Sequence, residues 1–258
     1  MVTIVSFDIE GDYAAFRDPS VTTNQTVYVI PSKSAVIGIL GAILGLRRPL
    51  SLGPYGPGII YDDQFMDLLK STMIGIRVRG GTKKISFFTN HRSLKESKTK
   101  PFKSELLLSP KYTIYVKTSD AYLKRLSERL QNNDFVYTPT LGHSYCPARI
   151  LCYKEYDAEK VVPDQLMINT VVLDEMSETN SKERSFHFGR IEKMLNIVVE
   201  RHLHHFFKNG ELERLVLRHW IPVPTNNNDA PVPLESYSFQ RNIVNFYNTE
   251  SGQSLCMY

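Results

Sequence analysis

The feature that most constrains the fold is an apolar run, Ala35 to Leu46, within the stretch VIPSKSAVIGILGAILGLRR (29–48). A helix that is apolar on all sides must be covered by neighbouring elements, so this run predicts a helix in the core of a sizeable domain. Its twelve residues fall well short of the roughly 20 that span a bilayer. Ser32 or Ser34 is the expected N-cap. The run predicts a buried helix and no transmembrane segment.

Three glycines interrupt this helix, although each glycine inside a helix costs about 1 kcal/mol relative to alanine. Gly38, Gly41 and Gly45 stand at i, i+3 and i+7 and therefore share one face. One interpretation is close packing of the helix on a sheet. The other is the close approach of an external ligand near the helix start, where free N–H groups suit a phosphate.

The elements around the helix predict an α+β fold. Strands are expected at 2–9, 73–80 and 111–117, a second helix from Ser119 with Leu123, Leu126 and Leu130 on one face, and a further strand before about residue 145. This βαββαβ order is typical of ferredoxin-like, RNA-recognition-type domains. We therefore expect a ferredoxin-like domain over 1–145 and a smaller α+β region over 146–258 packed on it.

Within the C-terminal region, ARILCYKEYD, QLMINTVVLDE and LERLVLRHWIPV predict strands. The segment IEKMLNIVVERHLHHFF predicts an amphipathic helix.

The basic residues are concentrated in one segment. Residues 77–103 carry nine lysines and arginines against one acid, Glu96, so a net charge of +8 lies there while the whole chain carries only +4. Phe87, Phe88, Asn90 and His91 are interleaved with the cations of this segment. A charge run is usually a solvated surface, but one of a single sign between two predicted strands indicates nucleic-acid contact.

The remaining features favour a cytoplasmic protein that has no metal. The N-terminus MVTIVSFDIEGD lacks the basic start of a signal peptide, and three cysteines without a CxxC spacing indicate reduced thiols. His202, His204 and His205 are interpreted as a basic helix surface, because no further ligand stands at an established spacing. Asp8 and Glu10 share a strand face, as paired carboxylates do in metal nucleases, but solvated acids at a strand end are the favoured interpretation.

Four segments in order resemble the CRISPR-associated Cas-five family of the RAMP superfamily. They are GDYAAFRDP, PSKSAVIGILGAILG, SELLLSPKYTIYV and YTPTLGHSYCPARI, which together cover about the first 150 residues. The resemblance implies a ferredoxin-like fold with a β-hairpin thumb at about 80–110, and the chain is most similar to the subtype I-B form. It also implies a subunit of a type I Cascade complex that binds and caps the five-prime handle of the guide RNA (crRNA).

The same resemblance implies the partners and the site. The expected partners are the guide RNA, the Cascade backbone subunit and the Cascade large subunit, with contact to target DNA near the flanking motif left open and no membrane involved. No cofactor is expected. The expected RNA-binding residues are Phe16, Arg17, Ser32, Lys33, Ser34, Asn90, His91, Arg92, Lys98, Lys100, Lys103, Gly142 and His143.

Catalysis is the main alternative. One branch of the family is a metal-independent endoribonuclease that cuts repeat RNA and carries a tyrosine on the first helix and an adjacent Lys-His pair. Neither feature occurs here, so we expect no enzyme, although a different arrangement with His91 and Lys95 stays open. A third hypothesis is a ferredoxin-like module that binds only protein.

Overall fold

The computed structural model describes residues 1–21, 24–47, 50–51, 59–60, 63–92, 98–162, 164–175, 186–188, 196–208, 211–224, 232–237 and 244–258. Its helices are α1 (Lys33–Leu44), α2 (Asp63–Ser71) and α3 (Asp120–Asn132). The strands of the first half are β1 (Val2–Glu10), β2 (Tyr13–Ala14), β3 (Leu50–Ser51), β4 (Ile59–Ile60), β5 (Met73–Gly80), β6 (Lys84–Arg92), β7 (Thr99–Leu108) and β8 (Lys111–Lys117). The strands of the second half are β9 (Arg149–Val161), β10 (Asp164–Ile168), β11 (Val172–Glu175), β12 (Phe186–Phe188), β13 (Asn196–Lys208), β14 (Glu211–Val223), β15 (Val232–Tyr237), β16 (Asn245–Thr249) and β17 (Ser254–Met257).

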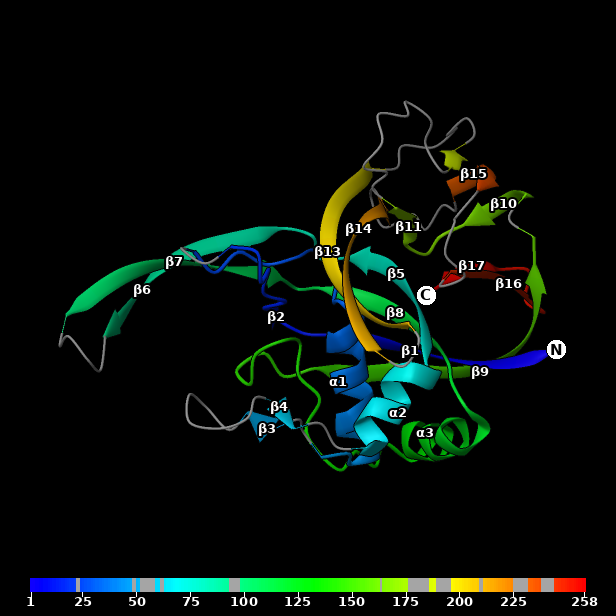
Figure 1. The fold of residues 1–258 in the computed structure, drawn as a ribbon, viewed down its shortest axis with the longest axis horizontal. Coiled ribbons are helices and arrows are strands. Elements are labelled where there is room, and N and C mark those ends of the chain that lie inside the picture. Colours follow the sequence, from blue (N-terminus) through cyan, green and yellow to red (C-terminus); the bar gives the residue numbers. More distant parts are fainter. Residues whose placement is uncertain are drawn as a thin grey trace.

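Strand β1 lies at the centre of the N-terminal half, where neighbours on both sides bury its apolar side chains. Ile4, Phe7 and Ile9 are at most 1% exposed. The strand pairs antiparallel with β8 on one side and with β9 on the other, and β5 pairs antiparallel with β8. The local order is therefore β9-β1-β8-β5, with α1 and α2 connecting β1 to β5 and α3 connecting β8 to β9. The three helices lie together on one side of these strands (Figure 1).

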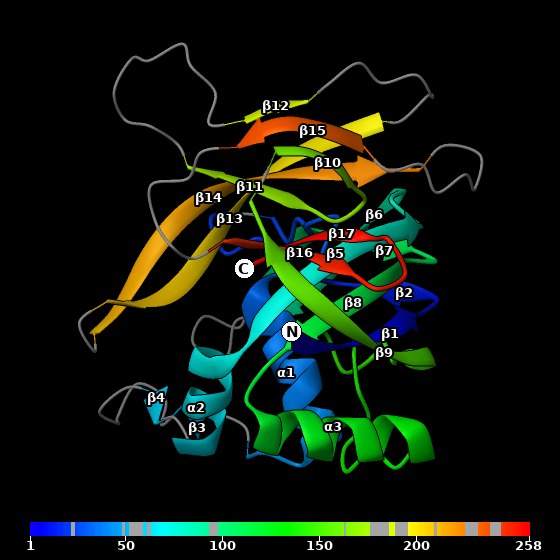
Figure 2. The ribbon, with the colours of Figure 1, turned by 90° about the vertical axis from the view of Figure 1, so that its right-hand side faces the viewer.

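The C-terminal strands extend the same sheet. In the described part of the chain it has nine strands, in the order β12-β15-β10-β17-β16-β9-β1-β8-β5. These added strands lie on the side away from the helices, as Figure 2 shows. The strand predicted between the second helix and residue 145 is absent from the described residues, and β9 takes its place beside β1. The prediction was wrong because the segment before residue 149 turns back on itself, with hydrogen bonds from Leu141 N to Cys146 O and from Ala148 N to Pro139 O.

The amphipathic helix predicted around residues 191–207 is also wrong over its described part, and residues 191–195 lie outside the described residues. Asn196–Lys208 forms β13, which pairs over its whole length with β14, and β11 joins β14 on the other side. No helix occurs among the described residues after Asn132, so the described part of the C-terminal region consists of strands and their connections.

Helix α1 forms where it was expected, but its glycines have other roles. Ser32 is the N-cap and its side chain accepts a hydrogen bond from Ala35 N, while Gly45 ends the helix in the left-handed conformation at φ 76°. A Cβ at Gly38 would meet nothing within 4 Å, and one at Gly41 would lie 3.8 Å from the Phe65 ring of α2. The interpretation that the glycines bring α1 close to the sheet is therefore wrong, because the Ile37, Leu40 and Ile43 side chains fill that interface.

No helix among the described residues is long and apolar enough to cross a membrane.

Candidate nucleic-acid interface

The basic segment forms a long antiparallel hairpin, β6–β7, that extends away from the rest of the molecule (Figure 1). Directly paired residues of two antiparallel strands point to the same side of the ribbon. Phe88 pairs with Lys103, and Arg92 pairs with Thr99. One side of the hairpin therefore carries Phe88, Asn90, Arg92 and Lys103, all of them exposed.

The other predicted hairpin residues lie on or beyond the second side. Lys100 is exposed and its backbone pairs with that of His91, whose side chain is not among those described. Lys98 is exposed and precedes β7. The hairpin thus offers cations on both sides of a narrow ribbon, an arrangement that can follow a sugar-phosphate chain.

Sequence reasoning named Phe88 in the basic segment but did not include it among the binding residues. Its side chain is 74% exposed, and a large aromatic ring that far from a core is free to stack on a base. The alternation of the strand, which places Phe88 two residues from Asn90 and four from Arg92, is the signal that identifies it.

The start of α1 is a second cationic position. Lys33 is half-buried in the first turn of the helix, and burial lowers the pKa of its ammonium group to about 8. The Ser32 and Ser34 hydroxyl oxygens lie 3.0 Å apart, and Ser34 is exposed. An anion bound at this helix end would meet the lysine, a serine hydroxyl and free N–H groups.

The loop after β1 packs against the loop at 140–147. Ala15 N donates to Leu141 O at 2.8 Å. Gly142 has φ 97°, and a Cβ there would lie 2.1 Å from Ala15 O, so only glycine allows the two loops to meet. The His143 ring stacks on Tyr145, with the ring centres 5.0 Å apart, and Tyr145 is 59% exposed. The two loops quoted for the family resemblance are therefore neighbours in space.

Phe16 and Arg17 are adjacent in the first of these loops but have different environments. The Arg17 side chain is exposed and available to a phosphate. Phe16 is only 4% exposed and packs edge-on against Tyr112 in the core. The predicted role of Phe16 in RNA binding has no support in this structure, because its ring has no face open to a base.

The two acids of β1 are engaged with neighbouring side chains. Thr113 Oγ1 donates to Asp8 Oδ1 at 2.6 Å, and Arg79 forms an ion pair with the same carboxylate. Glu10 forms ion pairs with Lys111 at 3.9 Å and Arg149 at 3.3 Å. Among the described residues, no group of three or more His, Cys, Asp or Glu side chains is arranged to hold a metal ion.

Two histidines of β13, His202 and His204, line the interior instead of a basic surface. His202 and His204 are 0% and 6% exposed, and His204 Nε2 lies 2.9 Å from Nε2 of His219 on β14. Burial, and then the neighbouring His202 and His204, hold the pKa of His219 well below its usual value. The interpretation as a solvated helix face is wrong for His202 and His204, and the side chain of His205 lies outside those described.

A family model described as CRISPR-associated protein (Cas_Cas5) matches residues 4–232. The chain belongs to the Cas5 family of CRISPR-associated proteins. Among curated protein sequences, none matches this Cas5 chain.

Among solved structures, the Cas5 chain is similar to a CRISPR protein from Archaeoglobus fulgidus, with 12% identity, a TM-score of 0.57 and 99% of each chain covered. This likeness extends over the whole mixed α+β fold. A chain of a CRISPR RNA-guided surveillance complex is 14% identical with a TM-score of 0.48, covering 88% of this chain and 91% of the other.

Proposed function

We propose that this Cas5 protein is an RNA-binding subunit of a type I Cascade complex and that it holds the five-prime handle of the guide RNA. The observation that carries the proposal is the exposed hairpin β6–β7, which concentrates Arg92, Lys98, Lys100 and Lys103 on a projecting ribbon. Family membership supports the CRISPR context. Phosphate contacts would supply most of the affinity, and stacking and edge contacts the choice of bases.

We further assign the hairpin as the thumb of a ferredoxin-like unit. The order β9-β1-β8-β5, all antiparallel, with helices after β1 and after β8, supports this assignment. The backbone subunit, the large subunit and the subtype I-B identity belong to the same proposal. Contact with target DNA near the flanking motif would extend it.

In this proposal the protein binds RNA without cleaving it. Helix α1 has no tyrosine, and no Lys-His dipeptide occurs in the sequence. Acid–base cleavage of RNA needs titratable groups held at the scissile phosphate. A separate endoribonuclease would then supply the mature handle, which this subunit retains.

The test gives the purified protein labelled repeat RNA, with and without a chelator, over several pH values. Filter binding measures affinity, and a denaturing gel detects cleavage. Tight binding that weakens in Arg17→Ala, with intact RNA, supports the proposal. Cleavage at the handle boundary that is lost in His91→Ala would assign the endoribonuclease function instead, and the absence of binding would leave the protein-only module.

A further inference from the structure

A strap of extended chain, Gln25–Val29, runs beside the root of the hairpin and is hydrogen-bonded to it at Gln25 and Val27. Gln25 N donates to Lys103 O at 2.9 Å, and Glu105 N donates to Gln25 O at 2.9 Å. Lys84 Nζ, from the other strand of the hairpin, donates to Val27 O at 2.5 Å. The first residues of the strap therefore contact both strands of the hairpin near its root.

The far end of the strap is held by the body of the protein. Tyr112 on β8 donates its hydroxyl to Val29 O at 2.6 Å. Val29 N donates to both carboxylate oxygens of Glu200 on β13, at 3.0 and 2.9 Å. Residues 171 positions apart are joined by this contact, which connects the C-terminal β13–β14 ribbon to the strap.

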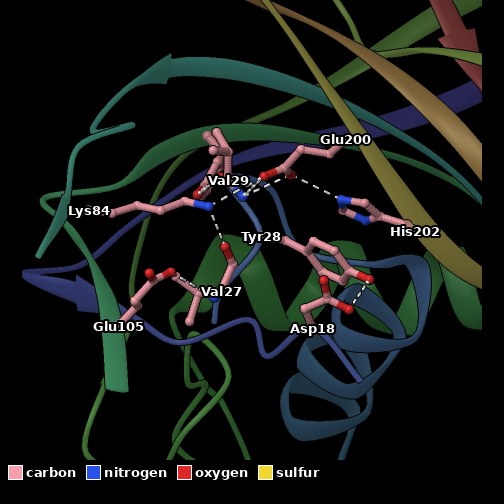
Figure 3. A network of polar contacts seen from close by, with 9 residues as sticks. Asp18, Val27, Tyr28, Val29, Lys84, Glu105, Glu200 and His202 are labelled. Atoms are coloured by element: carbon pink, nitrogen blue, oxygen red, sulfur yellow. Dashed lines mark hydrogen bonds and ion pairs between the residues drawn. The ribbon is translucent and has the colours of Figure 1, made fainter. Parts of the chain in front are cut away.

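Glu200 is the point at which three parts of the chain meet, as Figure 3 shows. Its side chain is 13% exposed, and Lys84 Nζ of the hairpin lies 3.6 Å from its Oε1. His202 Nε2 lies 3.1 Å from Oε2, and the His202 ring stacks on Tyr28 of the strap at 3.8 Å. A carboxylate so far from water needs charged or hydrogen-bonding partners, and here they come from the strap, the hairpin and β13.

The connection between the hairpin and the central strands is short. Strand β5 ends at Gly80 and β8 begins at Lys111, so the root passes through Gly81, at φ 72°, and Ser109, at φ 45°. At the root, the β2–β7 pairing adds two residue pairs, and Ser109 N donates to Asp12 O at 2.8 Å. The strap and Glu200 add lateral contacts to those at the root, through Lys84 and Val29.

We propose that Glu200 is a positioning residue that fixes the direction of the β6–β7 hairpin through Lys84 and the strap. The consequence for RNA rests on the proposed function, whereas the hairpin's direction does not. If the fraction of molecules with a competent hairpin falls, the apparent affinity falls by the same factor. A fall to about a tenth would weaken RNA binding about tenfold.

A distance measurement tests the positioning directly. Cys152 is exposed whereas Cys146 and Cys256 are buried, so one spin label on Cys152 and one on Thr99→Cys, near the hairpin tip, report the hairpin's direction. Glu200→Gln and Lys84→Met are expected to broaden or shift the distance distribution. Lys84→Arg keeps the cation and is expected to restore the distribution of the native protein.

The matched control is Glu10→Gln, which removes one carboxylate charge from β1 without touching the strap. Because Glu200 is nearly buried, its replacement also costs stability, so each variant is first melted. Lys84, with 35% of its side chain exposed, gives an independent test if Glu200→Gln does not fold.

RNA binding gives a second test, because the positioning role and the simple loss of a negative charge predict opposite changes in affinity. Removing an acid beside a basic hairpin should strengthen RNA binding on charge alone, and Glu10→Gln is expected to leave it unchanged or slightly stronger. The positioning role predicts instead that Glu200→Gln weakens binding about tenfold while the salt dependence keeps its slope, since the phosphate contacts are retained.

The outcomes separate the two proposals. A changed distance in Glu200→Gln or Lys84→Met, with the Glu10→Gln distance unchanged, supports the positioning role even if the native protein binds no repeat RNA, a result that would contradict only the proposed function. Distances identical to those of the native protein in every folded variant would overturn the positioning role, whatever the RNA binding shows.

Discussion

The molecule contains two long antiparallel ribbons whose sides have opposite uses. The β6–β7 hairpin exposes Phe88 at 74% together with its lysines. The β13–β14 ribbon turns polar residues inward: Glu200, His202 and His219 face the core, while Val199 and Val216 are each 46% exposed. The inward side of β13–β14 thus combines these polar residues with buried Leu217 and Ile221. The same strand geometry serves as an exposed projection in β6–β7 and as part of the core in β13–β14.

The largest expected effect is a loss of stability when the core side of the β13–β14 ribbon is changed. Leu217 on β14 is fully buried in the main core, so Leu217→Ala should lower the free energy of unfolding by about 2–5 kcal/mol. Denaturant titration measures this loss, and Val216→Ala, at the neighbouring exposed position, should cost far less. Equal costs at 216 and 217 would show that the ribbon does not pack as described.

The second effect is a loss of RNA binding when the cations of the β6–β7 hairpin are removed. Replacing Lys98, Lys100 and Lys103 together by glutamine should weaken RNA binding by roughly 30- to 100-fold at moderate salt and reduce the slope of log K against log salt by about 2. The free energy of unfolding should stay unchanged because all three side chains are exposed. The control replaces Lys124, Lys154 and Lys160, which are exposed on α3 and β9, and an equal loss in that variant would contradict a specific role for the hairpin.

A third effect tests whether the start of α1 binds RNA together with the β6–β7 hairpin. Burial lowers the pKa of Lys33 to about 8, so most of the free protein carries it neutral at pH 9. A bound phosphate favours the charged form, and RNA binding at pH 9 should take up close to one proton. Calorimetry in two buffers of different ionisation enthalpy measures the uptake. Lys33→Gln should remove it, and an unchanged uptake in that variant would exclude Lys33 from the interface.

The smallest effect at neutral pH is the dependence of stability on the protonation of His219 in the β13–β14 ribbon. Because the pKa of His219 is lowered in the folded protein, the unfolded chain binds the proton more tightly. The stability that depends on a neutral His219 is therefore fully present above the ordinary histidine pKa of about 6.5. The free energy of unfolding falls as the pH drops below that value, because the unfolded chain then takes up the proton. Unfolding measured from pH 7 to pH 5 should show a shallower decline in His219→Gln, and identical declines would contradict the buried, neutral imidazole.

These ribbons also show where the sequence is informative. The exposure of the basic segment could be predicted because nine cations and one acid over 27 residues have no place in a core, whereas the hairpin itself was implied by the family resemblance. Strand β13 could not be predicted, because its inward positions at Glu200, His202 and His204 are polar. A pattern that equates apolar with buried finds no period of two in such a strand and favours a helix.

The same limit applies to the candidate site. Arg17, Lys33 and the hairpin cations follow from charge and from the family motifs, but the burial of Phe16 depends on Tyr112, nearly a hundred residues away. Glu200 was not identified at all, because its partners Val29 and Lys84 lie far away in the sequence. Local patterns do not report such contacts.

Crosslinking from each ribbon to the handle RNA tests most directly which of them binds it. A photoreactive phenylalanine analogue replaces Phe88 on β6 in one variant and Val216 on β14 in the other, both at exposed positions. Irradiation with labelled repeat RNA should give a strong crosslink from position 88 and none above background from position 216. A crosslink from position 216 with none from position 88 would contradict the assignment of the β6–β7 hairpin as the RNA-binding arm.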